Sequence, residues 1–435
     1  MAERLRRVVG VPGAVLLGLG SILGTGIFVS IGIAAGVTGP SVILAVALAA
    51  AVATFNGLSS AQLAASHPVS GGTYEYGYRY LNPTLGFVAG WMFVSAKSAS
   101  AATAALGFAG YALNAAGASG DAARIGIALG AIAVLTVVVV SGMRRSSRMN
   151  AAIVVLTIAA LLAFVIAGLP AAGDGAGATL DGMFDLDGAG VRDLLHATAL
   201  MFVAYTGYGR VATLGEEIRD PGKNIPRAIV LTLLSTVVLY AAVTFVAVAA
   251  AGAPALAGAT RSDAAPLEVL ARGFDVPGVA WVVAAGAVTA MLGVLLNLLL
   301  GLSRVLLAMS RRGDVPRGLA RLDGAEASPR RSVLVIAAIV AALALTGSVK
   351  TTWSFSAFTV LVYYALTNLA ALRLPAEHRR YPRVVPAAGL VCCLGLAFWV
   401  EQRIWLAGLG LIAAGLVWHA VARRLSARGS PIPED

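Results

Sequence analysis

Two hydrophobic segments of this 435-residue chain are interrupted by glycine where a membrane-spanning helix should be regular. The first interruption lies within Gly20–Phe28 and the second within Phe202–Arg210, in the first and the sixth hydrophobic segment of the chain. Backbone polar groups that are freed inside a bilayer must find other partners. Interruptions at corresponding places in two halves of a chain indicate a ligand site near the middle of the membrane, a pattern typical of secondary transporters.

The composition predicts a membrane protein. Hydrophobic residues make up 59% of the chain and charged residues only 12%, and the mean hydropathy is +0.85. Soluble proteins carry about 25% charged residues. Apolar runs recur at close to the ~20 residues that a membrane-spanning helix needs. We predict an all-α membrane protein with twelve transmembrane helices, at Val11–Ala34, Ser41–Ala64, Pro83–Ala112, Ile125–Ser141, Met149–Leu169, Leu194–Gly215, Ala228–Ala251, Val279–Ser310, Ser332–Thr346, Trp353–Leu372, Val384–Val400 and Ile404–Ala422.

The net charge is +11. The distribution of the basic residues between the two sides of the membrane indicates the orientation of the helices. With twelve spans, 23 of the 32 lysines and arginines fall on the side of both termini, 6 on the opposite side, and 3 inside spans. Basic loops remain in the cytoplasm. We therefore predict a protein of the cytoplasmic (inner) membrane that is surrounded by lipid, has both termini in the cytoplasm and has no nucleic-acid partner. The longest predicted outer loop is Ala171–Asp193.

Four stretches of the chain resemble one family of permeases. They are Gly24–Phe28 in the first span, Pro68–Tyr74 after the second, Phe202–Arg227 in and after the sixth, and Ser303–Pro316 at the end of the eighth. The third stretch includes the loop sequence Glu-Glu-Ile-Arg-Asp-Pro. In this order, and at these helices, they are similar to the amino acid–polyamine–organocation superfamily. The resemblance extends from residue 10 to about residue 375.

This resemblance implies a five-plus-five inverted repeat, with helices 1 and 6 unwound near Gly24–Gly26 and Tyr205–Gly207. The transporter core would span residues 1–375, with repeats at about 10–170 and 193–373. Residues 376–435 would form helices 11 and 12 and a cytoplasmic tail. The resemblance also implies amino-acid-like substrates and alternating access around the two broken helices.

The physical properties of broken helices agree with an amino-acid substrate. Amides exposed at the start of a half-helix suit a carboxylate, and the carbonyls that end the preceding half suit an ammonium. Glycine lets the backbone approach a ligand closely. The alternative is that these glycines only mediate close helix packing. The predicted substrate-binding residues are Ser21, Ile22, Gly24, Thr25, Gly26, Lys97, Ala101, Val203, Ala204, Tyr205, Thr206 and Gly207.

Charged residues inside the predicted spans are all cations: Lys97, Arg210 and Arg304. Intramembrane charge indicates function by default because it is costly. Lys97 is predicted to contact substrate or to carry a proton, since desolvation favours the neutral form of a lysine. Arg210 has a gating or a structural role, and Arg304 is expected to anchor helices. No aspartate or glutamate lies in a predicted span, which argues against cationic substrates because a buried cation needs a partner.

The coupling ion is left open by the sequence. Many relatives carry a lysine in helix 5 whose ammonium stands in for sodium, and the matching position here is Thr157. Three possibilities follow: sodium binds, Lys97 carries a proton, or transport is not coupled to an ion. The predicted coupling and gating residues are Lys97, Thr157, Tyr208, Arg210 and Asn297.

These observations favour a secondary active transporter of neutral amino acids, with anionic amino acids as a further possibility. The alternative within the same class is a cationic amino acid or polyamine permease or exchanger. An integral-membrane enzyme is disfavoured because no histidines are spaced as metal ligands and no nucleophile–base pair is evident. A channel is disfavoured because neither a filter loop nor a charged ring is visible. No catalytic residue, cofactor or metal site is predicted.

Overall fold

The computed structural model describes residues 9–68, 71–141, 147–186, 190–213, 217–322 and 329–428. In this part of the chain the structure is helical, and the one strand-like pairing is an isolated bridge between Val9 and Ile218. The predicted all-α class is therefore confirmed. The last residues of the predicted tail, 429–435, lie outside the described residues.

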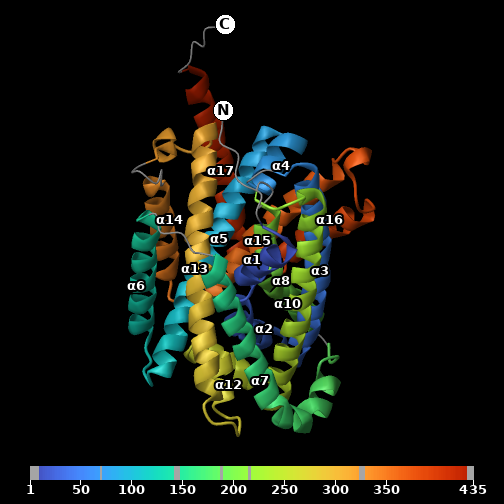
Figure 1. The fold of residues 1–435 in the computed structure, drawn as a ribbon, viewed down its shortest axis with the longest axis vertical. Helices are drawn as coiled ribbons and strands as arrows, with labels where there is room; N and C mark the ends of the chain where they lie inside the picture. The colour runs from blue at the N-terminus through green and yellow to red at the C-terminus, as the bar shows by residue number, and fades with distance from the viewer. Residues whose placement is uncertain are drawn as a thin grey trace.

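Each of the twelve predicted hydrophobic segments contains helix (Figure 1). The first comprises α1 (Val11–Ile22), the π-helical turn η1 (Gly26–Ser30) and α2 (Ile31–Thr38), and the sixth comprises α8 (Gly190–Tyr205), the 3₁₀ turn η3 (Thr206–Tyr208) and α9 (Gly209–Ala212). The others are α3 (Val42–Ser66), α5 (Pro83–Ala115), α6 (Asp121–Val140), α7 (Ser147–Gly182), α10 (Pro221–Ala251), α13 (Val279–Arg312), α14 (Arg330–Ala344), α15 (Val349–Leu372), α16 (Val384–Ala397) and α17 (Gln402–Arg428). Three shorter helices join them, α4 (Thr73–Tyr80), α11 (Ala253–Ser262) and α12 (Pro266–Ala271).

Seven helical segments in the described part of the chain are long and apolar enough to cross a membrane by length and composition. One of them is the continuous run Val11–Ser66, which contains two of the predicted spans. The predicted spans outside this set are short, such as α14 and α16, or rich in small and hydroxyl residues, such as α5.

The predicted outer loop at Ala171–Asp193 is wrong in its first half. Helix α7 continues through Pro170 as far as Gly182. A proline inside a helix removes a single backbone hydrogen bond and clashes with one carbonyl, and here the helix tolerates that loss.

The predicted interruption of the first helix is confirmed. α1 ends at Ile22, and Leu23 adopts an extended conformation with φ −72° and ψ 104°. The Gly24 carbonyl then accepts hydrogen bonds from the amides of both Ile27 and Phe28, each at 3.1 Å. The backbone continues as the wider η1 turn before it returns to α-helix in α2.

The predicted interruption of the sixth segment lies at the expected place but has a different form. α8 ends at Tyr205, and the chain tightens into the η3 turn, Thr206–Tyr208, before α9 begins. A 3₁₀ turn keeps hydrogen bonds between residues i and i+3. The backbone therefore changes its helical pitch here without becoming extended.

The two interruptions pack directly against each other at the centre of the bundle, where Figure 1 shows α1 and α8 among the long helices. A Cβ atom added to Gly207 would lie 2.3 Å from the Ser21 carbonyl oxygen, and one added to Gly26 would lie 2.7 Å from the Cβ of Ala204. The glycines therefore do mediate close helix packing, and this packing occurs where both helices are broken.

We expect Gly207→Ala to lower the free energy of unfolding by about 1–3 kcal/mol, because the added methyl group overlaps a backbone atom that cannot rotate away. Thermal unfolding of the purified protein in detergent measures this effect. The matched control is Gly130→Ala in α6, where an added Cβ would meet no atom within 4 Å. Equal unfolding midpoints for the two variants would contradict the prediction.

Candidate functional site

A cavity of about 390 Å³ lies between the two interrupted helices and is walled by α5, α13 and α15. Most of the residues predicted for substrate binding or coupling line it. They are Ser21, Ile22, Thr25, Gly26, Lys97, Val203, Ala204, Thr206, Gly207, Arg210 and Asn297.

Five predicted residues lie outside the cavity lining. Gly24 lies in the break itself and Ala101 is fully buried. The Tyr205 hydroxyl points to α3 and donates to the Val46 carbonyl at 3.3 Å. Tyr208 is buried against Tyr364, with ring centroids 5.5 Å apart, and Thr157 donates to a carbonyl of its own helix, that of Ile153, at 2.7 Å.

Most of the cavity wall that α13 forms was not predicted from the sequence, with Asn297 as the exception. The lining residues of α13 recur at three- and four-residue spacing, as one face of a helix does. This periodicity is visible in the sequence, but nothing in it indicates which face of the helix meets the cavity. The further lining residues include Tyr74, Phe93, Ser100, Glu217, Val294, Leu298, Gly301, Arg304, Val305, Ala308, Trp353 and Tyr364.

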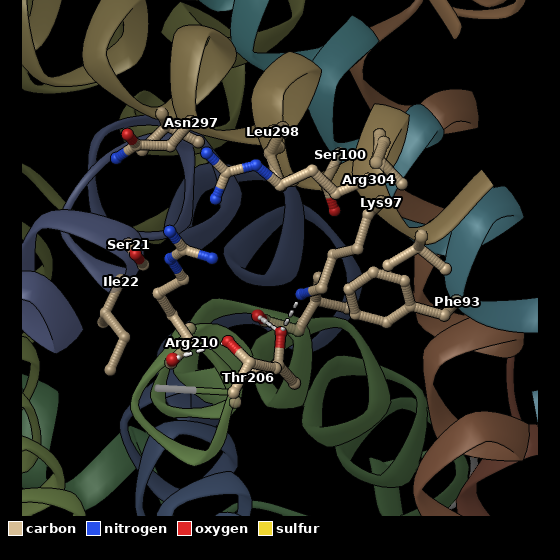
Figure 2. Close-up of a pocket in the computed structure, with 18 of the residues that line it drawn as sticks. Ser21, Ile22, Phe93, Lys97, Ser100, Thr206, Arg210, Asn297, Leu298 and Arg304 are labelled. Carbon is tan, nitrogen blue, oxygen red and sulfur yellow. Dashed lines mark hydrogen bonds between the residues drawn. The ribbon is translucent and has the colours of Figure 1, made fainter. Parts of the chain in front are cut away.

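Lys97 reaches the second interruption directly. Its Nζ atom donates a hydrogen bond of 2.8 Å to the Thr206 hydroxyl, which in turn donates to the Val203 carbonyl at 2.7 Å (Figure 2). A cation from α5 is thereby attached to the end of α8, where the negative end of the helix dipole lies. The predicted contact between Lys97 and the substrate site is geometrically possible because Lys97 lines the same cavity.

A buried tyrosine of α10 satisfies carbonyls at both interruptions. The Tyr240 hydroxyl lies 3.0 Å from the Ile22 carbonyl oxygen and 3.3 Å from the Ala204 carbonyl oxygen, and can donate to either. Freed backbone groups in a membrane need such partners. Tyr240 therefore bridges the two broken helices through their backbones.

Two further tyrosines serve the same purpose from other helices. Tyr364 of α15 donates to the Thr206 carbonyl at 3.1 Å, and Tyr111 of α5 donates to the Phe28 carbonyl at 2.7 Å. The Tyr111 oxygen also accepts from the Leu267 amide of α12 at 3.3 Å. These tyrosines were not predicted, because the sequence does not distinguish a tyrosine that binds a backbone carbonyl from any other buried aromatic residue.

Some polar groups at the first interruption have no hydrogen-bond partner among the described residues. The Thr25 hydroxyl is buried without a hydrogen bond, although Thr25 lines the cavity. The Gly24 amide donates to no backbone carbonyl of the described residues. Buried polar groups are almost always hydrogen-bonded, so this pair suggests where a ligand could supply the missing partner.

The cavity reaches one end of the molecule. Its lining includes Gly71 and Tyr74, beside or in α4, which lies at the upper end of the view in Figure 1. No residue of α11 or α12 contributes to the lining. Instead α11 packs closely on α2, where a Cβ added to Gly32 would lie 2.9 Å from the Leu256 carbonyl oxygen.

Comparison with known proteins identifies the family. The model of the family described as amino acid permease matches residues 13–422. This chain belongs to the amino acid permease family. It is thus a multi-pass membrane transporter and not an enzyme, and the resemblance proposed from four sequence stretches is confirmed.

Relatives of this permease are similar over nearly their whole length. An uncharacterized transporter of Mycobacterium tuberculosis is 41% identical over 430 residues, which cover 98% of this chain and 93% of the relative. A branched-chain amino acid permease of Lactococcus lactis is 31% identical, with 94% and 93% covered. A methylthioribose transporter of Bacillus subtilis is 27% identical, with 98% and 95% covered.

We expect Tyr240→Phe to lower the free energy of unfolding by about 1–2 kcal/mol, because the substitution leaves buried carbonyls without a donor. Chemical unfolding in mixed detergent micelles measures this difference. Tyr381→Phe is the matched control, since Tyr381 is a partly buried tyrosine away from the interruptions. A Tyr240→Phe variant as stable as the control would show that the bridge contributes nothing.

Proposed function

We propose that this permease is a secondary active transporter that moves amino acids across the cytoplasmic membrane by alternating access. The proposal includes twelve spans, a five-plus-five inverted repeat and cytoplasmic termini. One observation carries it: the interruptions of α1–α2 and α8–α9 face one cavity and contact each other through glycine. Secondary transporters that work by alternating access typically form their central site from such broken helices.

The site suits the polar groups of an amino acid. The Thr25 hydroxyl and the Gly24 amide lie at the start of the second half of the first helix, where the positive end of a helix dipole favours a carboxylate. The carbonyls that end α1 and α8 retain a second lone pair each for an ammonium. Ile22, Val203 and Val294 provide an apolar wall for an uncharged side chain.

The charges of the cavity argue against the cationic alternative. Lys97, Arg210 and Arg304 all line it, whereas Glu217 is the one carboxylate among the described lining residues. A cationic amino acid or a polyamine would be repelled by this excess of positive charge. We therefore favour neutral and anionic amino acids, and the branched-chain specificity of the Lactococcus lactis relative agrees with the neutral class.

The direction of the cavity fits an inward-facing conformation. It extends toward α4, whose residue Arg79 belongs to the basic side of the chain. Basic segments are cytoplasmic. The contact of Tyr111 with Phe28 and Leu267 would then hold the outer side closed.

Uptake into proteoliposomes tests the substrate class. We expect saturable uptake of labelled leucine or glutamate, and none of arginine or putrescine, because the cavity carries excess positive charge. The measurement compares vesicles with and without a pH or sodium gradient, and protein-free vesicles serve as the control. Uptake of arginine or putrescine in the absence of neutral or acidic amino-acid uptake would overturn the proposal.

Lys97 is proposed as the proton carrier. It is held by a single side-chain hydrogen bond, to Thr206 in the turn that ends α8, and forms no ion pair among the described residues. Loss of the Lys97 proton would remove the positive charge beside the η3 turn. Protonation would then affect α8 and α9, the broken helix that is expected to move. A sodium ion near Thr157 and Asn297 is the alternative.

We expect Lys97→Met to abolish accumulation driven by a pH gradient while some exchange of substrate across the membrane remains. The reason is that methionine keeps most of the side-chain volume but cannot carry a proton. The control is Lys223→Met, an exposed lysine in the first turn of α10. Unchanged pH dependence in Lys97→Met, or strict dependence on sodium in the unmodified protein, would refute this role.

A further inference from the structure

The cavity lining combines apolar side chains with a pair of arginines. Ile22, Val203 and Ala204 line it beside the interruptions, and the guanidinium groups of Arg210 and Arg304 reach the same cavity. Figure 2 shows that both guanidinium groups are directed toward the same space, with Asn297 on the same side as Arg304. Arg210 is half-buried and Arg304 is exposed, and both line the cavity.

The protein compensates the charge of the two arginines only in part, because Glu217 lines the same cavity and its charge acts on Arg210. Neither forms an ion pair with a carboxylate in the part of the chain that the structure describes. The like charge of Arg304 also acts on Arg210, and arginine does not lose its proton in proteins. Like charges in a partly desolvated space repel more strongly than in water. An anion between them would remove this repulsion.

The two arginines belong to different helices, one of which is the interrupted helix. Arg210 lies in α9, the short helix after the second interruption, whereas Arg304 lies in the long helix α13. A ligand that contacts both guanidinium groups would attach the broken helix to its neighbour. The third cation, Lys97, is already hydrogen-bonded to Thr206 and is not needed for this subsite.

We infer that Arg210 and Arg304 form a subsite for a second anionic group of the substrate, so that acidic amino acids bind with their side-chain carboxylate between the two guanidinium groups. The inference rests on the proposed amino-acid transport. A guanidinium fork matches a carboxylate with two parallel hydrogen bonds, and the Asn297 amide can donate another. The cavity volume of about 390 Å³ accommodates an amino acid.

Binding to the purified full-length protein in detergent tests this subsite, with thermal stabilisation as the readout. The probes are L-glutamate, L-leucine and chloride, each titrated separately. We expect Arg210→Gln and Arg304→Gln each to weaken glutamate binding about tenfold or more, the loss typical of one charge-assisted hydrogen bond. Leucine binding should change by less than about threefold. The control is Arg311→Gln, an exposed arginine at the end of α13 outside the cavity lining.

The outcomes separate the possible anions and the two proposals. Glutamate binding that is absent, or that both variants leave unchanged, would overturn the subsite. Chloride binding that depends on both arginines, with no such effect on glutamate, would also overturn it, because the anion would then be a separate ion. Leucine uptake into proteoliposomes without glutamate binding would refute only the subsite. No uptake of either amino acid would count against the proposed function itself.

Discussion

The close contact between two interrupted helices is the constraint on which the rest of this structure depends. Gly207 meets the backbone of Ser21, and Gly26 meets Ala204, at distances that exclude any larger side chain. The contact brings two helix ends into the centre of an apolar bundle. Each helix end leaves backbone groups without their usual partners, so the surrounding helices must provide polar atoms at this depth.

Tyrosines provide most of those atoms. Tyr240, Tyr364 and Tyr111 come from three different helices, and each donates to a carbonyl at or near an interruption. Their aromatic rings pack in the apolar core while the hydroxyl reaches the backbone. Among the described residues, the Thr25 hydroxyl and the neighbouring Gly24 amide have no hydrogen-bond partner, and Thr25 lines the cavity. The carbonyls that the tyrosines satisfy and the groups proposed for ligand binding thus belong to the same interrupted segments.

The distribution of charge follows from the same arrangement. An isolated cation in an apolar helix bundle is unfavourable, but Lys97, Arg210 and Arg304 all reach one cavity. Arg304 was expected only to anchor helices, but it also lines the cavity, where it could contact a ligand. The cavity thus concentrates positive charge where the broken helices meet, and the partial exposure of Arg210 and the exposure of Arg304 reduce the cost of these charges.

The amino-acid sequence by itself determined the helical class, the positions of the twelve hydrophobic segments, both interruptions and the family. These features depend on local composition and on glycine spacing, which can be read along the chain. Only the tertiary structure decided the rest of the lining from α13 besides Asn297, the tyrosine partners, and the approach of Arg210 and Arg304 to one cavity. The physical reason is that each depends on which face of a helix turns inward. When a helix is apolar on all sides, its hydrophobic pattern does not indicate the inward face.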